Sequence, residues 1–214
     1  MIRRVQRLAL KTVVVALMLL PRGGLEACPV EGEGGDPVLN RLKNRAAVPA
    51  TFEPFDFYDF ATLKIPAGAG RKHRDHWPDV DRALVDAQEK RAVQVVGYLI
   101  RVRLEAPESP NCHSDDPAQR DFHLWVTNSP SFDDDDSEGA VVVEVTPRIR
   151  SQHPSWSLTN LRRLGMQHSP IRAGGWLMLD AEHPEQVGRT RLTLWEIHPV
   201  TKIEVWSDER WREL

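Results

Sequence analysis

Hydrophobic and polar residues alternate along five stretches between residues 93 and 205. In residues 191–205, Trp195 and Ile197 fall on one face of an extended chain, whereas Glu196 and His198 fall on the other. A period of two residues is typical of a β-strand with one buried face. The pattern predicts strands at residues 93–104, 121–127, 140–146, 171–180 and 191–205.

The apolar positions of these stretches indicate which side of each strand faces the core. Successive residues of a strand point to opposite sides, so the polar positions between them face outward. We expect the first three strands to fill the core with Val96, Tyr98, Ile100, Val102 and Leu104, then with Phe122, Leu124 and Val126, and then with Val141, Val143 and Val145.

Capping residues and helical periodicity predict three helices. A short helix to about residue 45 starts after Asp36, a good N-cap that is followed by proline. A second helix is capped by Asp79 and continues to about residue 91, and a third, at residues 157–164, is ended by Gly165. The predicted apolar face of the second helix consists of Val80, Ala83, Leu84 and Ala87.

The order of these elements is three strands, a helix and two strands, which is typical of the five-stranded OB-type barrel. We therefore expect a mainly β fold with an OB-like barrel at residues 92–206. Residues 36–91 precede it as a helical and Pro/aromatic arm, in which prolines exclude a long helix and the aromatic side chains lie extended on the domain. Residues 28–35 are expected to form a flexible leader and residues 207–214 a loose, charged tail.

The first 27 residues have a different character from the rest of the chain. Four basic residues precede a short apolar run, and Ala27 supplies a small residue before a cut, as in a secretory signal peptide. The run is too short to span a bilayer comfortably, although an uncleaved N-terminal anchor is an alternative. We expect export to the periplasm or the extracellular space, with no transmembrane span in the mature chain.

Composition narrows the class of protein further. With 41% hydrophobic and 28% charged residues among 214, the chain is expected to be globular and large enough for one domain. Of its 28 basic and 31 acidic residues, five basic and one acidic lie in the signal, which leaves a mature chain of formal charge −7. A net acidic protein is a poor non-specific binder of nucleic acid.

Cys28 and Cys112 are the two cysteines of the chain. Export would permit a disulfide between them, but two cysteines alone do not establish that they meet. Cys28 also follows a sequence distantly similar to a lipoprotein cleavage site, so lipid attachment there is an alternative.

A candidate ligand face follows from the expected barrel. Its third strand would lie between the second and the fifth, with neighbouring strands about 4.8 Å apart. OB folds also bind ligands with the loops that join strands one and two and strands four and five. The candidate ligand-binding residues are Asp121, His123, Glu144, Glu196 and His198 on the strands, His113 in the first of these loops, and Arg148 beyond the third strand as an anion contact.

Imidazole and carboxylate groups are suitable ligands for zinc, manganese or non-haem iron. The candidate metal ligands are His123, His198, Asp121 and Glu144. A bound divalent metal could activate water for hydrolysis, and without metal a His–carboxylate pair could serve as acid and base. Ordinary cross-strand polar pairing is the alternative to both.

Three other clusters favour structural explanations. His73 and His76 lie in a basic stretch that is typical of a surface turn rather than a metal site, and the acidic run at residues 133–136 lacks the ligand spacing of a calcium loop. Trp156 is expected to pack inward at the entry of a helix. The sequence contains no Gly-rich phosphate loop and no nucleophile elbow.

Seven segments carry a resemblance to a known family. They are residues 40–45 (NRLKNR), 111–113 (NCH), 121–123 (DFH), 143–148 (VEVTPR), 153–156 (HPSW), 175–180 (GWLMLD) and 194–200 (LWEIHPV). On these segments the chain resembles an uncharacterised family of bacterial exported proteins over residues 40–206. The resemblance implies export and a single domain, and it implies no mechanism because the family has no established activity.

The expected function is that of a binding module of the bacterial cell envelope, with an unknown small ligand or envelope partner held at the polar face. One alternative is a metal-dependent hydrolase, of the phosphoester type, that uses the same residues. A second alternative is a scaffold that docks a partner through Phe55, Phe57 and Tyr58 of the arm. The sequence does not decide whether the protein is an enzyme.

Overall fold

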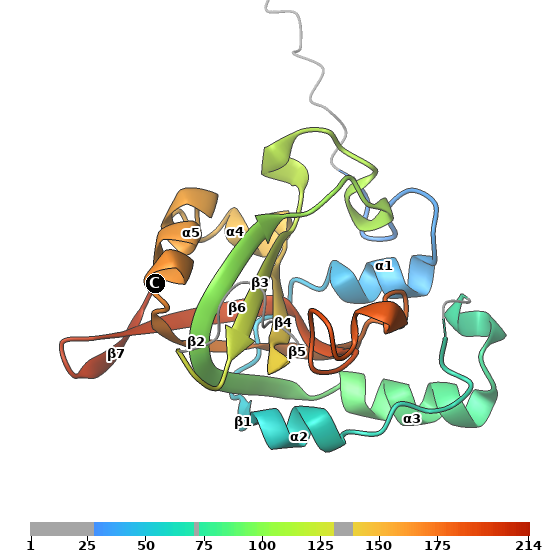
Figure 1. Ribbon diagram of the computed structural model, residues 1–214. Coiled ribbons are helices and arrows are strands. Elements are labelled where there is room, and N and C mark those ends of the chain that lie inside the picture. Colours follow the sequence, from blue (N-terminus) through green and yellow to red (C-terminus); the bar gives the residue numbers. More distant parts are fainter. Residues whose placement is uncertain (1–27, 71–72, 131–138) are drawn as a thin grey trace, which may run out of the picture.

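Five strands close into a barrel in the computed structural model of the protein, which describes residues 28–70, 73–130 and 139–214 (Figure 1). Neighbouring strands pair in the order β2, β3, β4, β6 and β5, and β5 pairs back onto β2. The β4–β6 pair is parallel and the other four pairs are antiparallel. The barrel strands are β2 (Ala92–Leu104), β3 (Phe122–Thr127), β4 (Val141–Val145), β5 (Pro170–Leu179) and β6 (Trp195–Ser207).

Helix α5 (Leu158–Met166) connects β4 to β5 and packs against β2. This is the expected position of the helix in an OB-type barrel, and the predicted fold class is therefore confirmed. The helix starts after Ser157, whose side chain accepts a hydrogen bond from the backbone of Asn160. It continues through Gly165, where we expected it to end.

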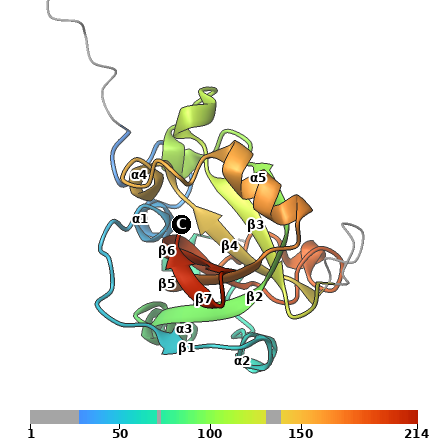
Figure 2. The same ribbon diagram turned by 90° about the vertical axis from the view of Figure 1, so that its left-hand side faces the viewer.

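Three helices precede or flank the barrel, and α2 and α3 lie on the opposite side of it from α5 (Figures 1 and 2). Helix α1 (Pro37–Lys43) starts as predicted, with Asp36 accepting hydrogen bonds from the first turn. The arm contains an unexpected helix, α2 (Phe57–Thr62), which is short enough to fit between two prolines and starts with a capping box at Asp56. Phe55 and Phe60 are buried edge to face, so the expected packing of the arm is confirmed for these aromatic side chains.

Helix α3 (Asp79–Glu89) differs from its prediction in two respects. Its N-cap is Pro78 rather than Asp79, and its buried residues are Val85 and Glu89. Val80 and Leu84, predicted for the buried face, are 67% and 56% exposed. The prediction was wrong because it counted apolar side chains, whereas the helix is oriented by a buried ion pair that Glu89 forms with Arg74.

In the first half of strand β2, the side chains that face the core are not the predicted ones. Val93, Val95 and Leu99 are buried in the barrel, whereas Val96 is 54% exposed. A β-bulge between Leu99 and Arg101 shifts the alternation of inward and outward side chains by one residue. The predicted alternation is therefore correct for the residues that follow the bulge and wrong for those that precede it. After it Val102 and Leu104 pack against the core, as predicted, while Ile100 joins a second apolar cluster outside the barrel. Tyr98, before the bulge, is half-buried and lies outside the main core cluster.

The other predicted core positions are confirmed. Phe122, Leu124 and Val126 of β3 and Val141, Val143 and Val145 of β4 belong to the main core cluster, and Trp156 is fully buried. Val145 is followed by a short helix, α4 (Pro147–Arg150). Single 3-10 turns occur at η1 (Arg74–His76), η2 (Ser109–Asn111), η3 (Pro117–Gln119) and η5 (Pro184–Gln186).

Two further strands extend the sheet. β1 (Glu53–Pro54) pairs in parallel with β2, and β7 (Arg210–Glu213) pairs with the end of β6. The expectation of a loose tail was therefore wrong. Asp208 and Glu209 adopt positive φ and form a tight turn, and Trp211 packs edge to face on Trp206 with ring centroids 5.3 Å apart.

The predicted signal peptide and the acidic run at residues 133–136 lie outside the described residues. Within the described part of the chain, no helix has the length and apolar character to cross a membrane. Cys28 and Cys112 form a disulfide, which is compatible with an exported protein.

Candidate metal centre

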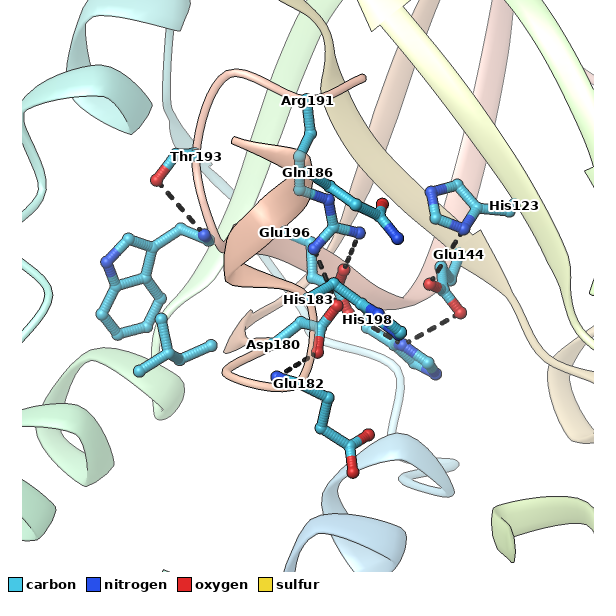
Figure 3. A network of polar contacts seen from close by, with 12 residues as sticks. His123, Glu144, Asp180, Glu182, His183, Gln186, Arg191, Thr193, Glu196 and His198 are labelled. Carbon is cyan, nitrogen blue, oxygen red and sulfur yellow. Dashed lines mark hydrogen bonds and ion pairs between the residues drawn. The ribbon is translucent and has the colours of Figure 1, made fainter. Parts of the chain in front are cut away.

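The outward faces of β3, β4 and β6 carry a cluster of buried polar side chains (Figure 3). His123 on β3 is opposite Glu144 on β4, and β4 pairs in turn with β6, which carries Glu196 and His198. Each of these four residues has a relative exposure of 6% or less. The expected face therefore exists, but it lies beneath other parts of the chain rather than in contact with solvent.

Glu144 lies between the two histidines. Its Oε1 is 3.4 Å from Nδ1 of His123, and its Oε2 is 3.3 Å from Nδ1 of His198. The same His198 nitrogen is 3.2 Å from Oε1 of Glu196. On its other side, His123 Nδ1 is 3.1 Å from Oε1 of Glu105, so each imidazole is placed between two carboxylates.

Asp121 completes the cluster just before β3. Its Oδ1 accepts a hydrogen bond of 3.0 Å from Asn111, and its Oδ2 lies 3.6 Å from Nε2 of His198. That separation is too long for a hydrogen bond. Among the described residues, neither Oδ2 of Asp121 nor Nε2 of His198 has a hydrogen-bond partner, although both atoms are buried. Asp121, Glu144 and His198 each offer a ligand atom within 4.8 Å of the other two, and we call this trio the Asp121–Glu144–His198 site.

Arg191 organises the side of the cluster nearest the β5–β6 loop. Its guanidinium donates to Oδ2 of Asp180 at 2.7 Å and to Oε2 of Glu196 at 3.1 Å, and the Arg191 side chain is fully buried. Sequence reasoning missed this role because a single arginine before a strand is usually solvated. The signal that was present is its position at the start of the most regular alternation in the chain.

Lys43 of α1 is the second cation that sequence reasoning missed. Its side chain is 7% exposed, with Nζ 3.4 Å from Glu108 and 3.9 Å from Glu182. The prediction of α1 gave its ends but not which face it buries. The attraction of Glu108, Glu144 and other nearby carboxylates outweighs burial and raises the pKa of Lys43 well above its usual value.

Burial determines the protonation of the site. It raises the pKa of Glu144 well above its ordinary value, with a further increase from Glu196, and together with Asp180 it raises the pKa of Glu196 to about 7. Burial also raises the pKa of Asp121 and lowers the pKa of His198 to about 4. His198 is therefore neutral at physiological pH, which is the state in which imidazole binds a metal.

His123 has a different environment from His198. Burial lowers its pKa, and its ring stacks on Trp125 with the centroids 4.1 Å apart. Burial alone would raise the pKa of Glu105, but the hydrogen bond and charge of His123, with Arg103, leave it lowered. His123 belongs to the cluster, but the Glu105 contact places its Nδ1 beside the trio rather than within it.

Two predicted site residues lie away from the cluster. His113 is exposed, with Nε2 2.9 Å from the carbonyl oxygen of Glu33. Arg148 donates to Oδ1 of Asn44 at 3.0 Å and to the carbonyl oxygen of Cys28. The histidines at 73 and 76 are exposed at an η1 turn, in agreement with the surface role predicted for them.

Six of the seven sequence segments singled out above supply residues to this cluster or to its surroundings. Residues 121–123, 143–148, 175–180 and 194–200 supply its two histidines and all of its named carboxylates except Glu105. Residues 40–45 and 111–113 supply Lys43 and Asn111. Residues 153–156 instead supply the buried Trp156, which stacks on His153.

The arrangement offers one neutral imidazole and two carboxylates whose ligand atoms lie within 4.8 Å of one another. This donor set suits zinc, manganese or iron in the divalent state. Comparison of the sequence with models of known protein families finds no match, and comparison with curated proteins finds none either.

Proposed function

We propose that the protein is an exported OB-type binding module whose ligand is a divalent cation, zinc or manganese, bound by Asp121, Glu144 and His198. The observation that carries this proposal is the pair of buried atoms without hydrogen-bond partners, Asp121 Oδ2 and His198 Nε2, 3.6 Å apart. Two ligand atoms that each lie about 2.1 Å from a tetrahedral zinc ion are about 3.4 Å from one another. The observed separation is close to that value.

The contacts of His198 support the same assignment. A metal-binding histidine usually donates its other ring N–H to a carboxylate, which fixes the tautomer and orients the ring. Here Nδ1 lies 3.2 Å from Glu196, and Arg191 in turn holds Glu196. Nε2 is then the unprotonated nitrogen, and it is the atom that faces Asp121.

The balance of charge in the cluster also favours a cation. Burying unpaired carboxylates is unfavourable, so an excess of them calls for protons or a metal. Two buried cations, Lys43 and Arg191, neutralise part of the negative charge of the cluster. A divalent cation would neutralise most of the negative charge that remains. The buried carboxylates of the cluster are those of Glu105, Asp121, Glu144, Asp180 and Glu196.

Burial favours a binding module over a hydrolase. The side chains of His198, Asp121 and Glu144 are 0%, 2% and 8% exposed, whereas a catalytic metal needs a position open to substrate. The alternative of a docking scaffold receives little support from the arm. Phe55 is buried and Phe57 is half-buried, so only Tyr58 of that expected aromatic surface is well exposed.

The test is elemental analysis and calorimetric titration with Zn²⁺ and Mn²⁺ of the protein purified without chelator. We expect about one equivalent of one of these cations per chain, and its loss in a His198→Ala variant. His76→Ala is the matched control, because His76 is exposed at a surface turn, and it is expected to retain the cation. Absence of binding in the unaltered protein, or equal binding in both variants, would refute the proposal.

A further inference from the structure

The Asp121–Glu144–His198 site lies beneath a cap made of two segments distant in the sequence. The cap consists of residues 28–45, which include α1, and residues 105–120 of the loop between β2 and β3 (Figure 1). Asn111 of the loop donates to Asp121, and Arg45 donates to the carbonyl oxygen of His198 at 3.0 Å. The cap therefore contacts two of the three proposed ligand residues directly.

Hydrogen bonds and a disulfide, rather than apolar packing, join the two halves of the cap. Leu39 is the only buried hydrophobic side chain in residues 28–45, all of which the structure describes. Glu33 donates its backbone N–H to Ser109 at 2.9 Å, and Asn44 donates to Pro110 at 2.8 Å. The halves are covalently linked by Cys28–Cys112.

The backbones of the two halves of the cap approach so closely that a side chain at the point of contact would clash. Gly32 adopts a positive φ, and a Cβ at this position would lie 2.1 Å from the carbonyl oxygen of Ser109. Segments with few buried apolar contacts open locally at a low free energy. A cross-link that closes an 84-residue separation restricts such opening strongly. Both cysteines are only half-buried, so a reductant can reach them.

We propose that the Cys28–Cys112 disulfide is a redox lock that controls exchange of the bound cation, an inference that rests on the proposed function. While the disulfide is intact, the cap stays closed over the site and the cation exchanges slowly. Reduction by a dithiol releases the residues 28–45 from the loop, and the cation then exchanges rapidly with solvent.

The chemical step is thiol–disulfide exchange. A thiolate of the reducing dithiol attacks one sulfur of the disulfide, the bond between Cys28 and Cys112 breaks, and a mixed disulfide forms. The second thiol of the reductant then attacks the mixed disulfide. The two cysteines end as thiols, having taken up two electrons and two protons, and the dithiol ends as a disulfide.

The first measurement is the rate at which cation-loaded protein transfers Zn²⁺ or Mn²⁺ to an excess of a chromogenic chelator. We expect at least tenfold faster release from a Cys28→Ser/Cys112→Ser variant than from the oxidised protein. Reducing the unaltered protein with a phosphine should give the same increase, and the phosphine should have no effect on the double variant. Equal rates in the oxidised, reduced and substituted proteins would overturn the proposal.

A second measurement does not depend on the cation and separates this proposal from the proposed function. Amide hydrogen exchange of metal-free protein is compared before and after reduction, starting from folded protein in case the double variant fails to fold. Faster exchange in residues 37–45 and 105–120, with β3 and β4 still protected, supports the lock even if no cation binds. Loss of protection throughout the barrel would overturn it, because the disulfide would then stabilise the whole fold. Cation binding with unchanged release and unchanged exchange would leave the proposed function intact and refute the lock alone.

Discussion

Arg74 and Glu89 lie as deep in the protein as Asp121 and His198, yet their polar atoms are satisfied in a different way. The Arg74 guanidinium donates to both Glu89 oxygens, at 2.6 and 2.7 Å, and to the carbonyl oxygen of Leu179 at 2.9 Å. The Glu89 carboxylate also accepts the backbone N–H of Leu179 at 3.0 Å. Asp121 and His198 instead face one another with one atom each left without a hydrogen bond.

The difference separates a structural polar contact from a candidate ligand site. Buried polar groups in native proteins are nearly always hydrogen-bonded, and an exception requires an explanation. The Arg74–Glu89 pair needs none, because it attaches η1 and α3 to the end of β5 with complete bonding. The Asp121–His198 pair is incomplete in the protein alone, and a cation would complete it.

Breaking the satisfied pair is expected to have the largest effect on stability. A Glu89→Ala variant leaves the Arg74 charge buried without a counter-ion, and such a change costs about 3–5 kcal/mol. Urea unfolding measures the loss, which should be the same with and without Zn²⁺ or Mn²⁺.

The matched control is Glu53→Ala. Glu53 pairs with Arg91, but its side chain is 52% exposed, and exposed pairs contribute at most about 1 kcal/mol. Equal losses in the two variants would contradict the distinction drawn between buried and exposed pairs.

The pH dependence of the cluster gives the next largest effect. Burial and the neighbouring Asp180 raise the pKa of Glu196 to about 7, from an ordinary value of 4.5 in the unfolded chain. Because the folded-state pKa is raised, its contribution to stability is complete below pH 4.5 and is lost as the pH rises through 7. The loss is about 3 kcal/mol for this shift.

A Glu196→Gln variant should remove that loss. The free energies of unfolding of the two proteins are measured at pH 5 and pH 8 with a chelator present, and their difference is compared between the two pH values. His198 contributes in the opposite direction, but its contribution is common to both proteins and cancels in the difference. Glu204→Gln is the control: Arg172 lowers the pKa of Glu204, so its contribution is complete above pH 4.5 and the pH 5 to 8 slope should not change. An unchanged slope in the Glu196 variant would contradict the assigned pKa.

The barrel was predictable because each strand repeats a simple signal. In β3 and β4, alternate apolar residues such as Leu124 and Val143 fill the core, and only one phase of the strand buries them. The exceptions have local causes. The bulge after Leu99 changes the phase within β2, and hydrophobicity does not reveal a bulge when Val95 and Val96 are equally apolar.

The candidate site was predictable only in part. Its strand residues followed from the strand order, which places Glu144 beside His123 and His198 once the OB-type arrangement is assumed. Lys43 and Arg191 did not follow, because their burial depends on how α1 and the β5–β6 loop fold over the barrel. Side-chain contacts between segments far apart in the sequence leave no periodic pattern. The burial of the whole face was missed for the same reason.

Replacing an atom of the unsatisfied pair should have the smallest effect on the metal-free protein. In an Asp121→Asn variant the side chain keeps its shape, and Asn111 can still donate to its remaining oxygen. A buried carboxyl whose pKa is already raised by burial loses little when its charge is removed, so we expect the metal-free stability to change by less than about 1 kcal/mol. The effect should appear when the cation is added: at 100 times the dissociation constant, binding stabilises the unaltered protein by about 2.7 kcal/mol, and the variant should lose this gain. Thermal unfolding of both proteins with and without Zn²⁺ or Mn²⁺ measures the two quantities together. A large loss of stability in the metal-free variant would instead make Asp121 a structural residue like Glu89. Without the cation, removing the Asp121 charge can lower stability only if that charge already stabilises the metal-free fold.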